Sequence, residues 1–160
     1  MSKSVNRVRS AALAKGLTIT IERMAASTRT AQEAATACGC EVAQIVKSLI
    51  FEGADSSELK LILVSGQHEL NTAVIRRVVG ESLNRADARR VREETGFAIG
   101  GVAPIGHLKP VETWIDDVLL NFDTVWAAAG APNAVFQITP DDLVVATGGT
   151  VFHNGDRPGK

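Results

Sequence analysis

The run at residues 59–65 is almost wholly apolar and sets the strongest limit on the fold. A strand without a polar face is typical of a central position in a sheet, where both faces are covered. Residues 45–51 are rich in β-branched and aromatic side chains and predict a second strand. The turn-forming residues 52–58 lie between these segments, so we expect a hairpin that brings the two strands side by side.

Helical periodicity and capping signals predict helices at residues 5–15, 31–38, 71–79 and 87–95, and a last helix that starts at Thr139. Further short strands are expected at residues 17–21, 97–99, 113–117, 124–128 and 134–138. Helices and strands alternate irregularly, and the links between strands are short and mixed. This order favours an α/β fold with a mixed, largely antiparallel sheet and packed helices over a doubly wound parallel sheet.

The length of 160 residues, 45% of them hydrophobic, fits a single domain spanning residues 1–160. Residues 149–160 are predicted to form a polar C-terminal tail with one short strand at 150–152. No apolar run approaches the roughly 20 residues of a membrane helix, and the charged N-terminus lacks the apolar core of a secretory signal. We therefore expect a cytoplasmic protein with no membrane contact.

Charge is nearly balanced, with 17 Lys and Arg against 18 Asp and Glu. A protein that holds long nucleic acid by releasing counterions is usually strongly basic, so any nucleic-acid contact here should be local, such as a tRNA end. Six arginines fall within residues 76–92. They form either a solvated helix face or a patch that faces phosphates.

Cysteine and histidine give no sign of a metal centre. Cys38 and Cys40 are the two cysteines of the chain, whereas a structural zinc site needs four ligands, and the three histidines are far apart in sequence. We expect no metal and no disulfide framework. The two thiols are predicted to be reduced and inert at the end of a helix, where Gly39 supplies the stop signal.

Lys47 stands out because it interrupts an apolar strand pattern. Alternation places Lys47 on one face of the strand at residues 45–51, with apolar neighbours, and Ser48 on the other face. A strand that is apolar on both faces is covered on both, so the ammonium of Lys47 should be partly desolvated. It either extends to solvent or pairs with an acid, or else it forms a cationic group at the floor of a pocket for an anionic or carbonyl ligand.

Residues 96–107 form a second unusual segment, rich in glycine and closed by a histidine. Its glycines permit positive φ and close approach of a ligand to the backbone, and its proline stiffens the loop. The spacing matches neither a Walker A loop nor a dinucleotide fingerprint. The loop is either a tight turn capped by its histidine or a set of backbone N–H donors for a carbonyl or oxyanion. The residues concerned are Gly100, Gly101, Pro104, Gly106 and His107.

Two further segments allow both a structural and a ligand-binding interpretation. Small residues at 127–134, which include Gly130 and Asn133, indicate either close packing or a wall shaped for a small ligand. The hydroxyls at residues 28–30 either cap the helix that follows Thr30 or line the mouth of a pocket. No Ser/His/Asp order and no paired carboxylates stand out.

Five segments occur in an order that resembles the YbaK-type aminoacyl-tRNA deacylases, the free-standing relatives of the editing (insertion) domain of bacterial prolyl-tRNA synthetase. The resemblance covers residues 5–147, and the segments are Thr30–Ala35, Gln44–Phe51, Gly100–His107, Phe122–Gly130 and Thr139–Leu143. It implies the YbaK/prolyl-tRNA synthetase-associated domain fold and a hydrolase that removes a wrongly attached amino acid from tRNA, classically tRNA-Pro. It also implies no metal or organic cofactor, with the aminoacylated tRNA 3′ end and prolyl-tRNA synthetase as partners.

The resemblance assigns roles to residues of this chain. The lysine of the family's strand motif corresponds to Lys47, which would engage the tRNA end. The family's glycine–proline loop corresponds to Gly100 or Gly101 through Pro104, and the backbone of this loop would surround the aminoacyl group. The resemblance also implies that the terminal 2′-hydroxyl of the tRNA helps to activate water. The candidate catalytic residues are therefore Lys47, Gly100 and Gly101, and the candidate substrate-binding residues are Thr30, Ser48, Pro104, Gly106, His107, Gly130 and Asn133.

Several alternatives stay open. The amino acid removed is alanine, serine, cysteine or 2-aminobutyrate, and His107 is catalytic, a substrate contact or a cap. A second site that hydrolyses wrong products is physically sensible. One methylene group contributes only about 1–3 kcal/mol of binding free energy, so a synthetase cannot fully reject amino acids of nearly the same size and shape. The competing functions are a deacylase that acts on another tRNA and a non-catalytic module that binds a tRNA 3′ end or a small ligand.

Overall fold

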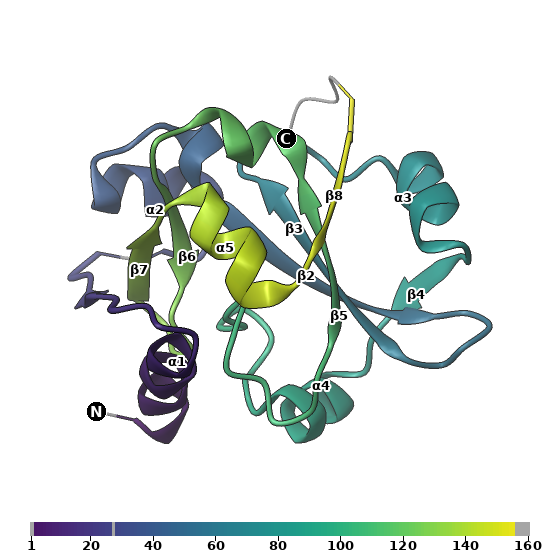
Figure 1. The fold of residues 1–160 in the computed structure, drawn as a ribbon, viewed down its shortest axis with the longest axis horizontal. Coiled ribbons are helices and arrows are strands. Elements are labelled where there is room, and N and C mark those ends of the chain that lie inside the picture. Colours follow the sequence, from purple (N-terminus) through teal and green to yellow (C-terminus); the bar gives the residue numbers. More distant parts are fainter. Residues whose placement is uncertain (1, 27, 156–160) are drawn as a thin grey trace.

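The computed structural model describes residues 2–26 and 28–155, which form two sheets with helices packed around them (Figure 1). The strand order is β4-β2-β3-β5-β8 in the larger sheet and β1-β7-β6 in the smaller. The strands are β1 (Ile21–Arg23), β2 (Val46–Gly53), β3 (Leu59–Ser65), β4 (Leu83–Arg85), β5 (Glu112–Asp116), β6 (Val125–Ala128), β7 (Ala134–Ile138) and β8 (Thr150–Phe152). The helices are α1 (Lys3–Ala14), α2 (Ala31–Cys38), α3 (Thr72–Val79), α4 (Ala88–Thr95) and α5 (Pro140–Thr147), with 3-10 turns η1 (Val42–Gln44) and η2 (Asp117–Asn121).

Strand β3 occupies the centre of the larger sheet, and all seven of its residues are buried. It pairs antiparallel with β2, from Val46 opposite Ser65 to Glu52 opposite Leu59, and parallel with β5. Strand β8 adds a second parallel pair, whereas the smaller sheet is wholly antiparallel. The predicted hairpin and the mixed sheet are therefore both confirmed.

The alternation of β3 divides the core into two layers. Leu61 and Leu63 face a large cluster that includes residues of α1, α4, β6 and β7. Ile62 and Val64 face a smaller cluster completed by Ile75 of α3 and by residues of β5 and β8. Apolar side chains on both faces of β3 thus account for the helices on both sides of the sheet.

The outer edge of β2 is left open over part of its length. Strand β4 pairs only with Phe51–Gly53, and a single parallel bridge joins Ile45, the residue before β2, to Trp126 of the smaller sheet. The N–H of Gly53 donates to the carbonyl of Glu58 (2.9 Å), so the odd-numbered residues of β2 direct their backbone toward the β3 side. The even-numbered Ser48 therefore directs its N–H and carbonyl toward the open edge.

Helix α1 fixes two glycine-containing loops against the core. Ser4 Oγ donates to the carbonyl of Gly130 (2.7 Å), and Arg7 Nε donates to the carbonyl of Gly106 (2.8 Å). The guanidinium of Arg7 also lies 4.8 Å from the ring centre of Phe97. The loops at 96–107 and 129–133 are thus held by the first helix of the chain, a long-range constraint that no local pattern indicates.

Two of the expected strands differ in the structure. Of residues 17–21 only Ile21 joins β1, and Leu17 and Ile19 before it pack on the core without strand pairing. The strand expected at 97–99 is wrong: Phe97 is buried, but the carbonyl of Ala98 accepts a hydrogen bond from the N–H of Gly101 (2.9 Å), which closes a turn. Both errors arise because burial of apolar side chains does not require a strand partner.

The segment expected to be a polar tail contributes to the fold. Strand β8 forms at the residues where a short strand was predicted, and Asn154 beyond it is completely buried. Residues 156–160 of this segment lie outside the described residues. No helix in the described part of the chain combines the length and the apolar character needed to cross a membrane.

Gly130 provides a test of the contact with α1. Its φ is +95°, and a Cβ added there would lie 2.9 Å from Phe97 Cε1 and 3.0 Å from the carbonyl oxygen of Ser4. We expect Gly130→Ala to lower the free energy of unfolding by about 2–4 kcal/mol, from the left-handed backbone and the forced contacts together. Gly148→Ala is the matched control, because Gly148 has a φ of +64° but no atom within 4 Å. Gly148→Ala should lower the free energy of unfolding by about 1 kcal/mol. Urea titration of both variants measures the two losses, and equal losses would contradict the packing argument.

Candidate functional site

A cavity of about 400 Å³ opens beside the exposed edge of β2. Its walls come from β2, the start of α2, strands β6 and β7, and the glycine loop at 99–102. Four of the predicted site residues line it: Thr30, Lys47, Ser48 and Gly100. The polar lining is completed by Thr28 and Arg29, and the apolar lining is Ala31, Ala34, Ile45, Val46, Leu49, Ile99, Val102, Trp126, Ala127, Ala128, Ala131, Ala134 and Val135.

Lys47 is half-buried in this cavity, as the alternation of its strand predicted. Its Nζ donates a hydrogen bond to the backbone carbonyl of His68. Burial lowers the pKa of Lys47 from its ordinary value, and the nearby carboxylates of Asp116 and Glu69 oppose that shift. An ammonium group has three donors, so one neutral acceptor leaves it able to bind a further ligand.

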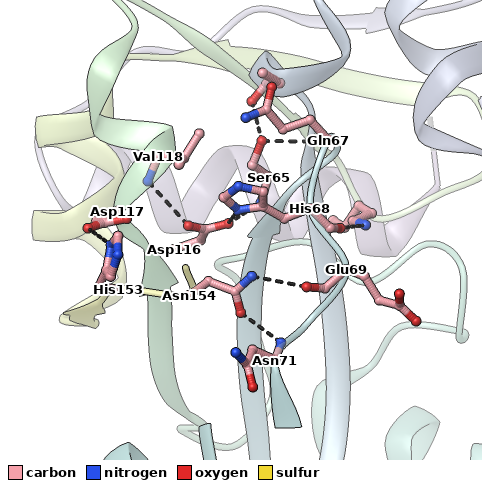
Figure 2. Close-up of polar contacts among 12 residues, drawn as sticks. Ser65, Gln67, His68, Glu69, Asn71, Asp116, Asp117, Val118, His153 and Asn154 are labelled. Atoms are coloured by element: carbon pink, nitrogen blue, oxygen red, sulfur yellow. Dashed lines mark hydrogen bonds and ion pairs between the residues drawn. The ribbon is translucent and has the colours of Figure 1, made fainter. Parts of the chain in front are cut away.

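His68, whose carbonyl binds Lys47, belongs to a buried polar network that sequence reasoning missed. Figure 2 shows this network around Asp116. The carboxylate of Asp116 is fully buried and accepts hydrogen bonds from His68 Nδ1 (2.8 Å), the N–H of Ser65 (3.0 Å) and the N–H of Val118 (3.2 Å). His68 is itself only 4% exposed. The available signal was positional: His68 follows the end of β3, and Asp116 ends the neighbouring parallel strand β5.

Asn154 holds the same loop from the other side, as Figure 2 also shows. Its Nδ2 donates to the carbonyl of Glu69 (3.0 Å), and its Oδ1 accepts from the N–H of Asn71 (2.8 Å). The loop after β3, which supplies the acceptor for Lys47, is therefore fixed by β5 and by the segment after β8.

Thr30 serves both of the roles that its sequence context left open. Its Oγ1 accepts from the N–H of Glu33 (3.0 Å), and the Glu33 carboxylate accepts from the N–H of Thr30 (3.3 Å), which completes a capping box at the start of α2. The same residue lines the cavity. The helix start is thus fixed at the cavity wall by local hydrogen bonds.

The glycine loop divides into a part at the cavity and a part packed on the core. Gly100 is exposed, with a φ of +93° and no atom within 4 Å of an added Cβ, and it lines the cavity. Gly101 and Pro104 are buried and do not line it. Gly106 packs against α1, and a Cβ added to it would be 3.2 Å from Val8 Cα. The catalytic role of Gly101 and the substrate-binding roles of Pro104 and Gly106 stay predictions.

His107, Gly130 and Asn133 also lie outside the cavity lining. His107 Nε2 is 2.7 Å from the carbonyl oxygen of Ala103, and its ring packs edge-on against Phe97. Gly130 packs on α1, and Asn133 adopts a φ of +65° in the connection between β6 and β7. Each of these residues has a structural place in the fold, and a contact with substrate stays a prediction for all three.

The cysteines and the six arginines within residues 76–92 lie apart from the cavity lining. Cys38 and Cys40 are free, and burial, with the nearby Cys40 thiol and the Glu22 carboxylate, raises the pKa of Cys38 to about 11. Within residues 76–92, Arg90 pairs with Glu52 and Glu94, and the other five arginines are exposed. They lie on and between α3 and α4, whereas α2 is at the other end of the molecule in Figure 1. Their role in docking tRNA stays a prediction.

Among the described residues, no group of three or more His, Cys, Asp and Glu side chains is placed to hold a metal ion. The site is instead built from one half-buried cation, hydroxyls, an open strand edge and small apolar side chains. This combination can bind a small apolar group beside an anionic or carbonyl-bearing one.

Comparison with known proteins agrees with this chemistry. The model of the aminoacyl-tRNA editing domain family matches residues 25–145, and the chain belongs to that family. The protein YwhH of Bacillus subtilis (strain 168) is 32% identical over 117 residues, which are 73% of this chain and 74% of YwhH. Proline–tRNA ligase of Thermosipho melanesiensis is 39% identical over 79 residues, which are 49% of this chain and 14% of the ligase.

Two solved structures share the whole architecture. A protein described as a candidate trans-editing enzyme for prolyl tRNA synthetase is 45% identical with a TM-score of 0.88, over 96% of this chain and 97% of that chain. The hypothetical protein APE2540 is 31% identical with a TM-score of 0.83, over 92% of this chain and 97% of that chain. The mixed α/β fold predicted from the sequence is thus the fold of a tRNA-editing domain.

The buried ring of His107 leads to a prediction about pH. Burial, together with the charge of Arg7, lowers the pKa of His107 below its ordinary value of 6.5, and the Ala103 carbonyl only partly opposes this. As the pH falls, the unfolded chain therefore takes up the proton first. The free energy of unfolding should fall as the pH drops from 6.5 through the lower pKa of the folded state, and the contribution is fully present above 6.5.

NMR titration of the imidazole and urea unfolding between pH 5 and 7 measure the two sides of this prediction. His107→Gln should flatten the pH dependence of stability in that range. A folded-state pKa of His107 at or above 6.5 would show that burial does not control its protonation.

Proposed function

We propose that this protein is a trans-editing deacylase that hydrolyses the ester of a small non-cognate amino acid on tRNA, with tRNA-Pro as its substrate. One observation carries the proposal: Lys47 and Gly100, both predicted to be catalytic, line one small cavity with apolar walls. Membership of the editing-domain family and the likeness to a candidate trans-editing enzyme for prolyl tRNA synthetase support the choice of substrate.

The cavity offers a separate place for each part of an aminoacylated adenosine. The ammonium of Lys47 can bind a ribose hydroxyl or phosphate oxygen of the terminal nucleotide. The small side chains of β6 and β7 can enclose the side chain of the amino acid, and their bulk limits its size. Backbone N–H groups of the open β2 edge and of the glycine loop can serve as donors to the ester carbonyl.

The reaction needs little more than positioning and electrostatic stabilisation. Water adds to the ester carbonyl carbon, negative charge develops on the carbonyl oxygen, and N–H donors fixed in a partly dry cavity stabilise that charge. The bond from the carbonyl carbon to the ribose oxygen then breaks, and that oxygen takes a proton. The products are the free amino acid and the tRNA hydroxyl. We propose that no metal takes part and that the neighbouring ribose hydroxyl orients the water.

The decisive experiment follows ester loss from charged tRNA. We expect the protein to deacylate tRNA-Pro carrying one of alanine, serine, cysteine or 2-aminobutyrate, to spare prolyl-tRNA-Pro, and to keep its activity in EDTA. Lys47→Ala should reduce kcat/KM by about 100-fold or more, the usual effect of removing one preorganised group that stabilises the transition state.

Lys60→Ala is the matched control, because Lys60 lies on the neighbouring strand but binds Glu112 (2.8 Å) and does not line the cavity. It should leave deacylation unchanged. No ester loss above the buffer rate on tRNA-Pro would reject the proposal. A panel of other charged tRNAs would then separate a deacylase of different specificity from a module that only binds the 3′ end.

The size of the cavity can be tested independently of its charge. Ala128 lines the cavity and is partly exposed, so a larger side chain there should fill space without breaking the core. We expect Ala128→Leu to reduce kcat/KM about tenfold or more by displacing the aminoacyl group, with a greater loss for 2-aminobutyrate than for alanine. Ala73→Leu, on the exposed face of α3, is the control. Equal activity of the two variants would place the amino acid elsewhere.

A further inference from the structure

We propose that His68 is a positioning residue for Lys47. The His68 ring is anchored on Asp116, and this anchor fixes the backbone carbonyl of His68, which orients the ammonium of Lys47 toward the cavity. The inference rests on the proposed function for its kinetic consequence only, because the arrangement of the three residues can be measured without substrate. His68 does not line the cavity, so its ring acts through Lys47.

The first step is the contact of Lys47 itself. A lysine side chain has four rotatable carbon–carbon bonds, so a half-buried ammonium needs a fixed acceptor to point in one direction. The carbonyl of His68 is the acceptor for Lys47 Nζ. It belongs to the loop after β3, whereas Lys47 belongs to β2, and the two strands are hydrogen-bonded neighbours.

The second step is what fixes that carbonyl. The N–H of His68 donates to the carbonyl of Ser65 (2.9 Å), which forms a tight turn at the end of β3. The ring is 2.8 Å from the Asp116 carboxylate through Nδ1, and neither side chain is more than 5% exposed. Because the carboxylate accepts, Nδ1 carries the proton. Both ends of the residue are therefore tied, one within its own loop and one to β5.

The third step is the competition that the ring prevents. Asp116 is the charge that most strongly favours the ammonium form of Lys47. Three N–H donors already engage its carboxylate, and His68 is the one side chain among them. Without the ring, the carboxylate has free acceptor capacity inside the protein, where an unpaired charge is costly. Lys47 should then turn away from the cavity to pair with Asp116.

The test uses two substitutions of His68 and one matched control. His68→Phe keeps the volume of the ring but removes the donor, whereas His68→Asn places an amide N–H close to the position of Nδ1. The control is His153→Phe, because His153 Nδ1 is likewise 2.9 Å from an aspartate, Asp117, but its side chain is 74% exposed. All three variants are first checked for folding by thermal unfolding.

The first readout is the NMR signal of the Lys47 ammonium in the free protein. In the wild-type protein we expect slow hydrogen exchange, since the group is held by a carbonyl. In His68→Phe we expect its pKa to rise, because the ammonium would pair directly with Asp116, and His68→Asn should restore the wild-type value. The carboxylates of Asp116 and Glu69 are the charges that act on Lys47 in this comparison.

The second readout is deacylation. His68→Phe should reduce kcat by about 10- to 100-fold with little change in KM, the scale of a misplaced catalytic group, while His68→Asn and His153→Phe stay near wild type. A Lys47 pKa and a kcat that change no more in His68→Phe than in His153→Phe would overturn the inference.

A change in only one of the two readouts would also overturn the inference, and two further outcomes are decisive. If His68→Phe does not fold, fast exchange of the Lys47 ammonium in the wild-type protein rejects the inference, and slow exchange with normal His68→Asn kinetics supports it. If the wild-type protein deacylates nothing, the proposed function fails, and the NMR comparison still decides whether His68 positions Lys47.

Discussion

The complete burial of β3 is the constraint from which the site follows. Its apolar side chains on both faces require cover from α3 on one side and from α1, α4 and the smaller sheet on the other. Its two neighbours, β2 and β5, are fixed by hydrogen bonding. On its outer edge, β2 pairs with the short β4 near one end, and a single bridge from Ile45 joins the smaller sheet at the other end. The cavity is the space beside the strand edge that neither neighbour fills.

The charges near this edge are arranged so that they do not cancel. Asp116 is buried with three N–H donors, and Lys47 is bound to a neutral carbonyl. A direct ion pair between the two would satisfy both charges and make the ammonium of Lys47 unavailable to a ligand in the cavity. The loop after β3 keeps them apart, with Asn154 and the Asp116–His68 contact as its two anchors.

Features that depend only on residues close together in the chain could be predicted from the sequence. The capping box at Thr30 and Glu33 sets the start of α2, and alternation in β2 identified Lys47 as a partly desolvated cation. The His68–Asp116 contact could not be predicted, because it joins residues 48 apart in sequence and depends on the pairing of β3 with β5. The strand expected at 97–99 failed for a related reason: Phe97 is buried by α1, and its burial carries no information about strand pairing.

The glycines predicted to form one site have different roles in the structure. Gly100 has open space around it at the cavity, so its freedom serves the approach of a ligand or the shape of the turn. Gly106 and Gly130 have positive φ and also lie against the backbone of α1, so both the backbone conformation and the packing require glycine there. Arg7 and Ser4 do not line the cavity, yet their side chains hold both loops by donating hydrogen bonds to backbone carbonyls. The shape of the cavity wall therefore depends on a helix that does not line it, and a sequence motif confined to the loop contains only part of what makes the site.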